Sequence, residues 1–388
     1  MTFHLVAPDS DFLYKLALPF ADAIAAGTPD RMLSASQIPA TGPYMTASYV
    51  PHHRWVLIRN PRFRQWSAAA QPRGYPDRIV LRLDVPAGPA VTAVEQSRAD
   101  VLLSPAARLR EIVTRYPNLL HSGPQPGTIG LVLNTRAYPF SVTAARRAVN
   151  YAIDRRTLIR LIGGSSAGEL TCQIMPPALP GYQPYCPYTA SPSPGGAWTA
   201  PDLAMAQKLV AASGTKGARV TVLTGAFGTS IPVVTTGRYI VSVLDQIGYR
   251  ASLRVISDYT AYDRAAYDSS YRPQVGWFGW YTDFPTPSDM IKPVLTCHSF
   301  VPSSAANLNT AEFCNPQVDA QISQALMLQA RAPNAAGALW ARIDREITDL
   351  APWVPIFNPV SSVLLSPRVR NYQFDPFYSL LIDQLWVR

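Results

Sequence analysis

The sequence lacks long hydrophobic runs and carries little charge. Only 15% of its 388 residues are charged, and no segment approaches the ~18 consecutive apolar residues of a transmembrane helix. Hydrophobic residues nevertheless make up 48% of the chain, which is typical of a folded protein and not of a disordered one. The length is sufficient for two substantial hydrophobic cores. We therefore expect a globular protein with two cores.

Lysine is scarce, so the formal net charge of +9 comes almost entirely from arginine. The only lysines are Lys15, Lys208, Lys216 and Lys292. The arginines are scattered, and their densest groups, 59–64 and 155–160, are interleaved with apolar residues. A nucleic-acid-binding surface normally concentrates its basic residues on one face or stripe. The pattern favours ordinary surface charge without nucleic-acid binding, and attraction of an anionic partner or membrane is the alternative.

The sequence has no recognisable metal, phosphate or cofactor site. The five histidines do not cluster with acidic residues at metal-ligand spacing, and the adjacent His52 and His53 are expected to be solvated. No glycine-rich phosphate loop follows a predicted strand. We predict neither a metal nor a cofactor.

One segment, 164–168, has the G-x-S-x-G pattern of serine hydrolases. Asp283 and His298 follow Ser166 and reproduce the hydrolase order of serine, acid and histidine. A nucleophile elbow requires a strand before the serine and a helix after it. Here a helix is predicted before Ser166 and a loop rich in cysteine and proline after it, so we predict that the protein is not an enzyme.

The four cysteines form two pairs that are local in sequence, and none has C-x-x-C spacing. We predict disulfides between Cys172 and Cys186 and between Cys297 and Cys314, with reduced buried thiols as the alternative. The first pair lies in 171–198, a long segment without periodicity that is dense in proline and glycine. A disulfide would hold such a loop in one conformation.

The remaining sequence alternates between strand and helix patterns, which predicts a mixed α/β fold. Strands are predicted at 2–6, 55–59, 79–83, 100–103, 127–133, 218–223, 249–255, 354–357 and 363–365. Helices are predicted at 12–23, 91–97, 105–116, 142–151, 154–161, 202–212, 239–246, 316–329 and 335–350. Asp154 is the expected N-cap of the helix that ends before Gly163.

Six short segments together resemble a known family. They are A-T-G-P-Y at 40–44, R-N-P-R-F-R-Q-W at 59–66, A-D-V at 99–101, L-N-T at 133–135 with P-F at 139–140, R-A-V-N-Y-A-I-D-R at 147–155, and G-W-Y-T-D at 279–283. Each segment is weak alone, whereas their shared order and spacing are specific. The chain resembles the bacterial extracellular solute-binding proteins of family 5, the oligopeptide- and dipeptide-binding group, from about residue 2 to its end.

The resemblance implies a two-lobed α/β periplasmic-binding-protein fold of type II, in the peptide-binding cluster. Lobe I would comprise residues 1–126 and 356–388, and lobe II residues 127–355. Segments 127–133 and 352–358 would be the hinge crossovers between the lobes. Family members carry an export signal and further residues before the matching region. Residues 1–9 do not have the pattern of a signal peptide, so the resemblance implies that lobe I is incomplete in this chain.

The resemblance also implies the ligand-binding residues. The acidic residue of the G-W-x-x-D pattern accepts the α-ammonium group of a peptide ligand, and Asp283 occupies that position. Capping of a turn is the alternative role for Asp283. Trp280 is the better aromatic candidate, with Trp277 and Tyr281 beside it. Strand alternation predicts Trp277 and Tyr281 on one face and Phe278 and Trp280 on the other, where core packing is the alternative.

Some family members hold the ligand's carboxylate with a basic residue three positions before this tryptophan. Trp277 occupies that position here, so the resemblance implies that this contact is absent. Nickel complexes, opines, sugars and other small solutes therefore remain open as ligands beside peptides.

The function implied by the resemblance is that of the solute-binding component of an ABC importer. Its expected partners are a peptide or other small solute and the membrane permease subunits. The protein would act as a monomer outside the cytoplasm, in the cell envelope or periplasm, where such proteins are often lipoproteins. A cytoplasmic ligand-sensing module of a regulatory protein, without a transport role, is the alternative.

Overall fold

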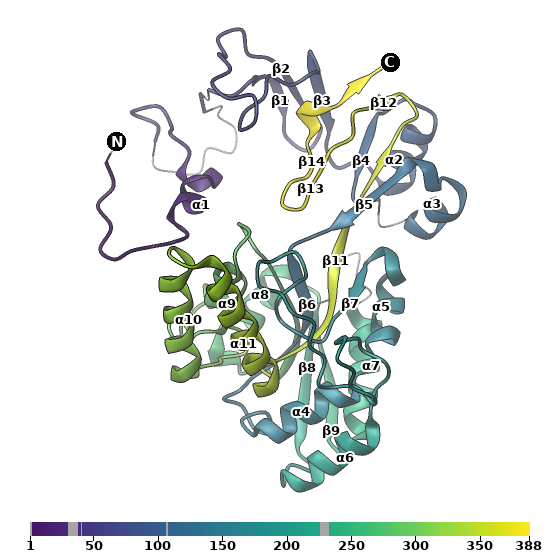
Figure 1. The fold of residues 1–388 in the computed structure, drawn as a ribbon. Helices are drawn as coiled ribbons and strands as arrows, with labels where there is room; N and C mark the ends of the chain where they lie inside the picture. The colour runs from purple at the N-terminus through teal and green to yellow at the C-terminus, as the bar shows by residue number, and fades with distance from the viewer. Residues whose placement is uncertain (1, 30–37, 40, 106–107, 226–232) are drawn as a thin grey trace. The chain divides into compact units, whose positions relative to one another are not determined.

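A computed structural model describes residues 2–29, 38–39, 41–105, 108–225 and 233–388 (Figure 1). The fold is mixed α/β, as the sequence predicts. The contacts group the chain into two compact units: unit 1 is Met1–Leu13 with Pro124–Val360, and unit 2 is Tyr14–Gly123 with Ser361–Arg388. Within the described residues, no helix is both long and apolar enough to span a membrane.

Unit 1 is built on a mixed sheet whose strands follow the order β11, β6, β10, β8 and β9. Strand β6 is antiparallel to both β11 and β10, whereas β10, β8 and β9 run parallel to one another. Short strand β7 pairs with the middle of β11. The strands are β6 (Gly127–Leu133), β7 (Gly168–Leu170), β8 (Arg219–Gly225), β9 (Arg250–Ile256), β10 (Val275–Tyr281) and β11 (Trp353–Leu365).

Helices cover both faces of this sheet and enclose two hydrophobic clusters (Figure 1). The first cluster packs one face against α4 to α7, and the second packs the other against α9 to α11. Alternation along β6 divides its side chains between the clusters, with Leu131 and Leu133 in the first and Val132 in the second. The helices of unit 1 are α4 (Thr143–Ala152), α5 (Arg155–Ile162), α6 (Leu203–Ala212), α7 (Val233–Gln246), α8 (Tyr259–Tyr267), α9 (Pro287–Leu295), α10 (Pro316–Gln329) and α11 (Pro333–Leu350).

Polar side chains of the segment at 146–155 hold the end of α11 and the start of β11. Arg146 donates to the Leu350 carbonyl at 2.9 and 2.7 Å, and Asn150 donates to the Trp353 carbonyl at 2.9 Å. Arg155 is fully buried, and its Nε donates to the carbonyls of Pro355 at 2.8 Å and Thr171 at 3.2 Å. The contacts of Asn150 and Arg155 give the R-A-V-N-Y-A-I-D-R segment a structural role, since these buried donors satisfy backbone acceptors of other segments.

Burial, rather than ion pairing, dominates the environment of Arg155. Its Nη atoms donate to the backbone carbonyl and the side-chain oxygen of Asn150. In the described residues, no carboxylate forms an ion pair with this guanidinium. Burial accordingly lowers the pKa of Arg155 to about 9. Its hydrogen bonds to uncharged oxygens therefore offset the cost of removing the charge from water.

The irregular segment after β7 is held by one buried acid and a disulfide. The Asp344 carboxylate accepts hydrogen bonds from the backbone amides of Ile174 and Met175 and from the side chain of Gln173. Cys172 is bonded to Cys186, and the second predicted disulfide, Cys297–Cys314, is formed as well. This segment is thus ordered although it contains little regular secondary structure.

Unit 2 contains a three-stranded antiparallel sheet in the order β1, β2 and β3. A separate layer packs α2 and α3 against β4 and the end of β11, around Val91, Val94, Ile112 and Leu364. The elements of unit 2 are β1 (Tyr44–Val50), β2 (Arg54–Arg59), β3 (Arg78–Arg82), α2 (Ala87–Glu95), β4 (Val101–Leu103), α3 (Leu109–Arg115), β5 (Leu120–Pro124), β12 (Val369–Arg370), β13 (Phe374–Asp375), β14 (Ser379–Leu380) and β15 (Trp386–Val387). Helix α1 (Phe12–Leu16) lies at the junction of the two units in the sequence.

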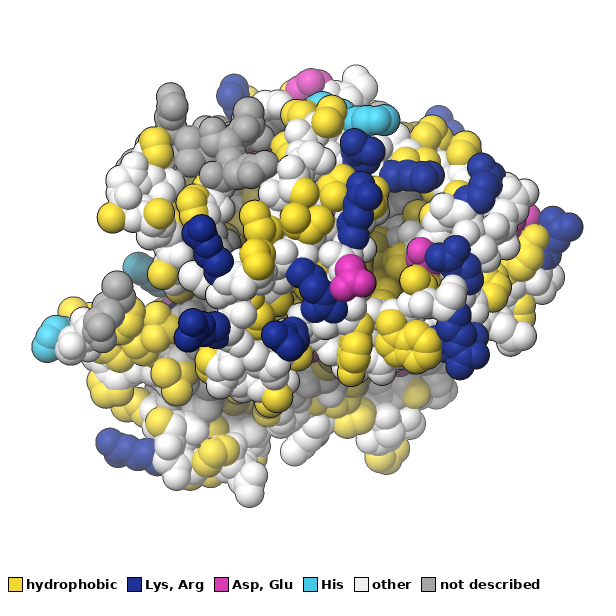
Figure 2. All heavy atoms as spheres, turned by 90° about the horizontal axis from the view of Figure 1, so that it is seen from above, with side chains coloured by type: hydrophobic (Ala, Val, Ile, Leu, Met, Phe, Trp, Pro, Cys, Tyr) yellow, Lys and Arg dark blue, Asp and Glu magenta, His cyan; other side chains and the backbone are white. Residues whose placement is uncertain are grey.

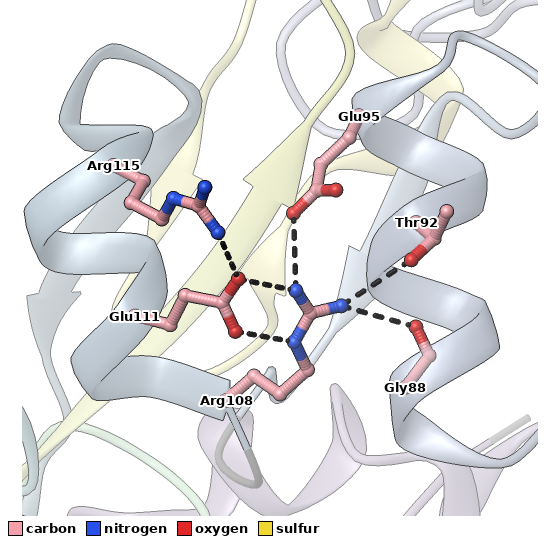
Figure 3. Close-up of polar contacts among 6 residues, drawn as sticks. All are labelled: Gly88, Thr92, Glu95, Arg108, Glu111 and Arg115. Atoms are coloured by element: carbon pink, nitrogen blue, oxygen red, sulfur yellow. Dashed lines mark hydrogen bonds and ion pairs between the residues drawn. The ribbon is translucent and has the colours of Figure 1, made fainter.

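Arg108 joins α2 to α3 (Figure 3). Its guanidinium makes a two-pronged contact with Glu111, with Nε 2.7 Å from Oε2. It also donates to the Gly88 carbonyl and the Thr92 hydroxyl, both at 3.3 Å. Hydrogen bonding to Arg108 lowers the pKa of Glu111. The planar fork of arginine suits this arrangement, because it contacts an acid and the neighbouring helix at once.

Most predicted elements are present, and the differences have local causes. Residues 2–6 are not a strand, and the predicted helix at 12–23 is reduced to α1 and a 3-10 turn at Pro19–Ala21, where proline interrupts it. The two strands predicted at 354–357 and 363–365 are one continuous strand, β11. Ala40 of the first family segment and residues 106–107 of one predicted helix lie outside the described residues.

The unit boundaries lie within five residues of the predicted lobe boundaries, at Pro124 and Val360, except that residues 1–13 group with unit 1 and not with the remainder of lobe I. Buried Asp11 accounts for part of this grouping. It accepts hydrogen bonds from Ser288 and Gln329, both in unit 1. The assignment of the units to family lobes, including an incomplete lobe I, stays a prediction.

Replacing Arg155 tests the role of the buried guanidinium. Arg155→Met is expected to lower the free energy of unfolding by about 3 kcal/mol, because it leaves buried carbonyls without donors. Arg160→Met, on the exposed side of the same helix, is the control and should change it by no more than about 0.5 kcal/mol. Urea unfolding followed by tryptophan fluorescence measures both. Equal effects of the two substitutions would refute the assigned role.

Candidate functional site

The predicted ligand-binding residues lie where β10 ends and the chain turns into α9. Tyr281, the last residue of β10, pairs with Gly127, the first residue of β6. Thr282 then fixes the chain to Pro126, whose carbonyl accepts from the Thr282 amide at 2.9 Å and hydroxyl at 3.1 Å. The position of the following residue, Asp283, is therefore set by the sheet of unit 1.

Strand alternation separates the two tryptophans, as predicted. Trp277 packs against the first hydrophobic cluster, and its Nε1 donates to the Thr236 hydroxyl at 3.1 Å. Trp280 packs against the second cluster on the opposite face, together with Phe278. Both rings are half-buried. The two tryptophans therefore pack on opposite faces of the sheet.

Trp277 lines a separate pocket in unit 1. Its other walls include Tyr262 and Tyr267 of α8, Phe278 of β10 and Thr310. Asp283 and Trp280 do not line this pocket. The structure thus does not bring Trp277 together with Asp283, and a ligand contact for Trp277 stays a prediction.

Asp283 is exposed at the start of the turn. Its backbone amide donates to the Asp289 carboxylate at 2.5 Å. Its own carboxylate has no hydrogen-bond or ion-pair partner within the described part of the chain. The turn-capping role is therefore filled by Asp289, and the Asp283 carboxylate is left to face solvent or a ligand.

Asp289, in the first turn of α9, holds both Trp280 and Asp283 by hydrogen bonds. This residue was not identified from the sequence. Its carboxylate accepts from the Asp283 amide, while its backbone carbonyl accepts from Trp280 Nε1 at 2.7 Å. The pattern T-P-S-D at 286–289 is the sequence signal that marks it, since an acid three residues after an N-cap threonine reaches back to preceding amides. Asp289 therefore links the indole and the acid.

The environment of Asp289 is acidic and largely dry. The side chain is 8% exposed, and burial raises its pKa to about 6. The nearby charges of Asp283 and Asp11 raise the pKa further, whereas amide donation from Asp283 and Phe284 opposes the increase. Asp289 therefore lies in a cluster of three acids with Asp283 and Asp11.

Tyr281 is the most exposed aromatic residue of the predicted set, at 42%. Its ring lies over Gly127, where a β-carbon would approach ring atom Cδ1 to 2.7 Å. Glycine at this position therefore allows the ring to lie against β6. Tyr281 can present a flat apolar surface next to Thr282 and Asp283.

The hydrolase-like segment does not form a nucleophile elbow. Helix α5 and a 3-10 turn at Gly164–Ser166 precede the short strand β7, which reverses the required order of strand and helix. Asp283 lies at the end of β10, a different strand. No group of three or more histidine, cysteine or acidic residues suited to a metal occurs among the residues that the structure describes.

Comparison with protein-family models shows which family the chain belongs to. The model for bacterial extracellular solute-binding proteins, family 5 Middle, matches residues 1–300. The chain belongs to this family. The predicted resemblance is thereby confirmed, and the family is one of solute-binding proteins.

Several curated proteins align with almost the whole chain. Heme-binding protein A of Haemophilus influenzae is 25% identical over 400 residues, which cover 97% of this chain and 66% of that protein. Probable di/tripeptide-binding protein 5 of Pseudomonas aeruginosa is 24% identical, over 95% of this chain and 67% of that protein. The chain spans about two thirds of the length of these curated relatives.

Solved structures share the fold of this chain. Clavulanic acid biosynthesis oligopeptide binding protein 2 matches with a TM-score of 0.83 and 23% identity, over 99% of this chain and 70% of that one. The periplasmic binding protein DppA of Helicobacter pylori, solved with the peptide STSA, matches with a TM-score of 0.76 and 18% identity, over 99% of this chain and 72% of that one. These similarities support the predicted periplasmic-binding-protein fold.

The raised pKa of Asp289 predicts a pH dependence of stability. The folded state binds the proton more tightly than the unfolded state, whose carboxyl has the ordinary pKa of 3.8. The resulting stabilisation is complete below pH ~4 and is lost as the pH rises through about 6. Between pH 4 and 7, the free energy of unfolding of wild type should therefore fall by roughly 1–2 kcal/mol relative to that of Asp289→Asn. This value is reduced for solvent screening.

Urea unfolding at several pH values measures this difference. Asp283→Asn serves as the companion variant, because removal of its charge should shift the transition to lower pH. A constant difference between wild type and Asp289→Asn from pH 4 to 7 would contradict the assignment.

Proposed function

We propose that this chain is the solute-binding component of an ABC importer, which captures peptides or similar small solutes and delivers them to permease subunits. Relatives named as di/tripeptide- and heme-binding proteins support a small-molecule ligand. The relative solved with the peptide STSA supports a peptide. The family description supports a site of action outside the cytoplasm. The proposal includes no catalytic step.

The unpartnered carboxylate of Asp283 is the observation that carries this proposal. Its backbone is fixed on one side by Thr282 and on the other by Asp289. With its backbone held and its carboxylate without a partner among the described residues, Asp283 is suited to a charge-assisted hydrogen bond to the α-ammonium group of a peptide. Trp280 and Tyr281 would supply apolar contact for the adjoining part of the ligand.

The carboxylate end of the peptide would be bound differently from its ammonium end. At position 277 the chain has tryptophan, with its Nε1 already donated to Thr236. A tryptophan cannot pair with a carboxylate as a basic residue would. We therefore propose that the ligand's positive end contributes more to recognition than its negative end.

Peptide derivatives separate these contributions. Isothermal titration calorimetry with tri-alanine is expected to show affinity that falls about 10- to 100-fold in Asp283→Asn, the value of a hydrogen bond to a charged group. N-acetyl-tri-alanine lacks the ammonium group and should bind wild type and variant equally weakly. C-terminal amidation should change the affinity of wild type less than acetylation does.

Glu169→Gln is the matched control, because Glu169 is an exposed acid of unit 1 on β7, which pairs with β11 and not with β10. This variant should bind tri-alanine as wild type does. If Asp283→Asn weakens the acetylated and free peptides by the same factor, Asp283 does not recognise the ammonium group. Failure of the wild-type chain to bind any of the peptides would contradict peptide capture.

A further inference from the structure

The positive charge of this protein is concentrated in unit 2. This unit carries 16 Lys and Arg against 9 Asp and Glu, so it accounts for +7 of the formal charge of +9. Unit 1 is larger but nearly balanced, with 18 basic and 16 acidic residues. Such an asymmetry attracts anionic partners to one part of the molecule.

Three arginines of unit 2 lie on one face of the β1–β2–β3 sheet. Arg54 of β2 pairs directly with Arg82 of β3, and Arg78 of β3 pairs with Ile58 of β2. Since positions two apart on a strand share a face, Arg54, Arg78 and Arg82 project from the same side. All three are exposed. We call this side the arginine face.

The direct pairing of Arg54 with Arg82 is unfavourable in the isolated protein. Like charges on opposing positions of two strands repel each other. The nearby acids of the strand ends pair with other residues: Asp77 contacts Arg59 at 2.8 Å, and Asp84 contacts His52 at 2.9 Å. Within the described residues, these two acids therefore do not offset the charges of Arg54 and Arg82, and an anion from outside the chain would relieve their repulsion.

Apolar side chains lie between these arginines, and most of them are exposed, although Val56 at the centre of the face is 3% exposed. The register places Met45 opposite Ile58, Val50 opposite Arg54, and Val80 two positions from both Arg78 and Arg82. Met45 is 43% exposed, Val50 and Val80 are 44% exposed, and Ile58 is 36% exposed. Figure 2 shows a face of the molecule where Lys and Arg side chains lie among hydrophobic ones with few acidic side chains.

We infer that the arginine face binds the surface of a membrane that contains anionic phospholipids. Guanidinium groups pair with phosphate oxygens, while apolar side chains enter the boundary between headgroups and acyl chains. A nucleic acid would match the arginines alone, because its backbone offers phosphates without an adjoining apolar layer. The combination of Met45, Ile58 and Val80 with the arginines therefore favours a lipid surface.

Sedimentation with lipid vesicles tests this inference on the full 388-residue chain. Wild type should bind vesicles of phosphatidylglycerol and phosphatidylcholine, and should bind pure phosphatidylcholine far more weakly. Its binding to the anionic vesicles should weaken, but not vanish, as the salt concentration rises. The triple variant Arg54→Gln/Arg78→Gln/Arg82→Gln should bind the anionic vesicles about 100-fold more weakly, at about one kcal/mol for each basic residue. Ile58→Thr/Val80→Thr should reduce the binding that persists at high salt.

The matched control removes the same charge elsewhere. Arg238→Gln/Arg250→Gln/Arg254→Gln changes three exposed arginines of unit 1 and should retain vesicle binding within a few-fold. Circular dichroism and the thermal midpoint establish that each variant is folded. Equal loss of vesicle binding in both triple variants would show that only the net charge of the protein matters. That result would overturn the inference.

Two other outcomes would also overturn it. A wild-type chain that binds duplex DNA but not anionic vesicles would identify a nucleic-acid surface instead. A concentration-dependent dimer that is abolished by the Arg54→Gln/Arg78→Gln/Arg82→Gln variant, without vesicle binding by wild type, would show that a second copy covers the face.

Discussion

Buried donors that hold the start of β11 are the interaction on which the rest of the structure depends. Arg155 donates to the Pro355 carbonyl, and Asn150 donates to the carbonyl of Trp353. Because β11 continues as one strand from Trp353 to Leu365, this attachment fixes a strand that both units use. Burial of the Arg155 charge removes it from water at a cost in free energy, and the hydrogen bonds of the guanidinium offset part of that cost.

The position of the candidate site follows from the same strand. Strand β6 pairs with β11, and β10 pairs with β6 until Tyr281 meets Gly127. The chain then leaves the sheet at a point determined by this register, and Asp289 holds the backbone of Asp283 directly beyond it. The sheet thus fixes the end of β10, and the buried Asp289 holds the backbone of the exposed Asp283 in place.

The regular elements could be predicted from the sequence because their signals are local. Alternation correctly separated Trp277 from Trp280, and the side chain of Asp154 caps α5 by accepting from the Thr157 amide as expected. The cysteine spacing likewise predicted the two disulfides that the structure contains. Local sequence could not show that 354–357 and 363–365 form one strand, because Pro359 and the serines between them weaken the pattern.

The site was only partly predictable, for a physical reason. Asp283 was recognised through its family segment, whereas the importance of Asp289 depends on a hydrogen bond formed only when the turn closes. The buried roles of Arg146 and Arg155 also depend on carbonyls about 200 residues away in the sequence. Charge in a sequence normally indicates a surface position, so burial of this kind becomes visible only in the folded chain.

The most direct test of a solute-binding role centred on Asp283 is native mass spectrometry of protein purified without added ligand. The account predicts a bound small molecule that carries a protonated amine in wild type and is lost from Asp283→Ala. Retention of the same molecule by Asp283→Ala, or a bound molecule without a cationic group, would contradict it.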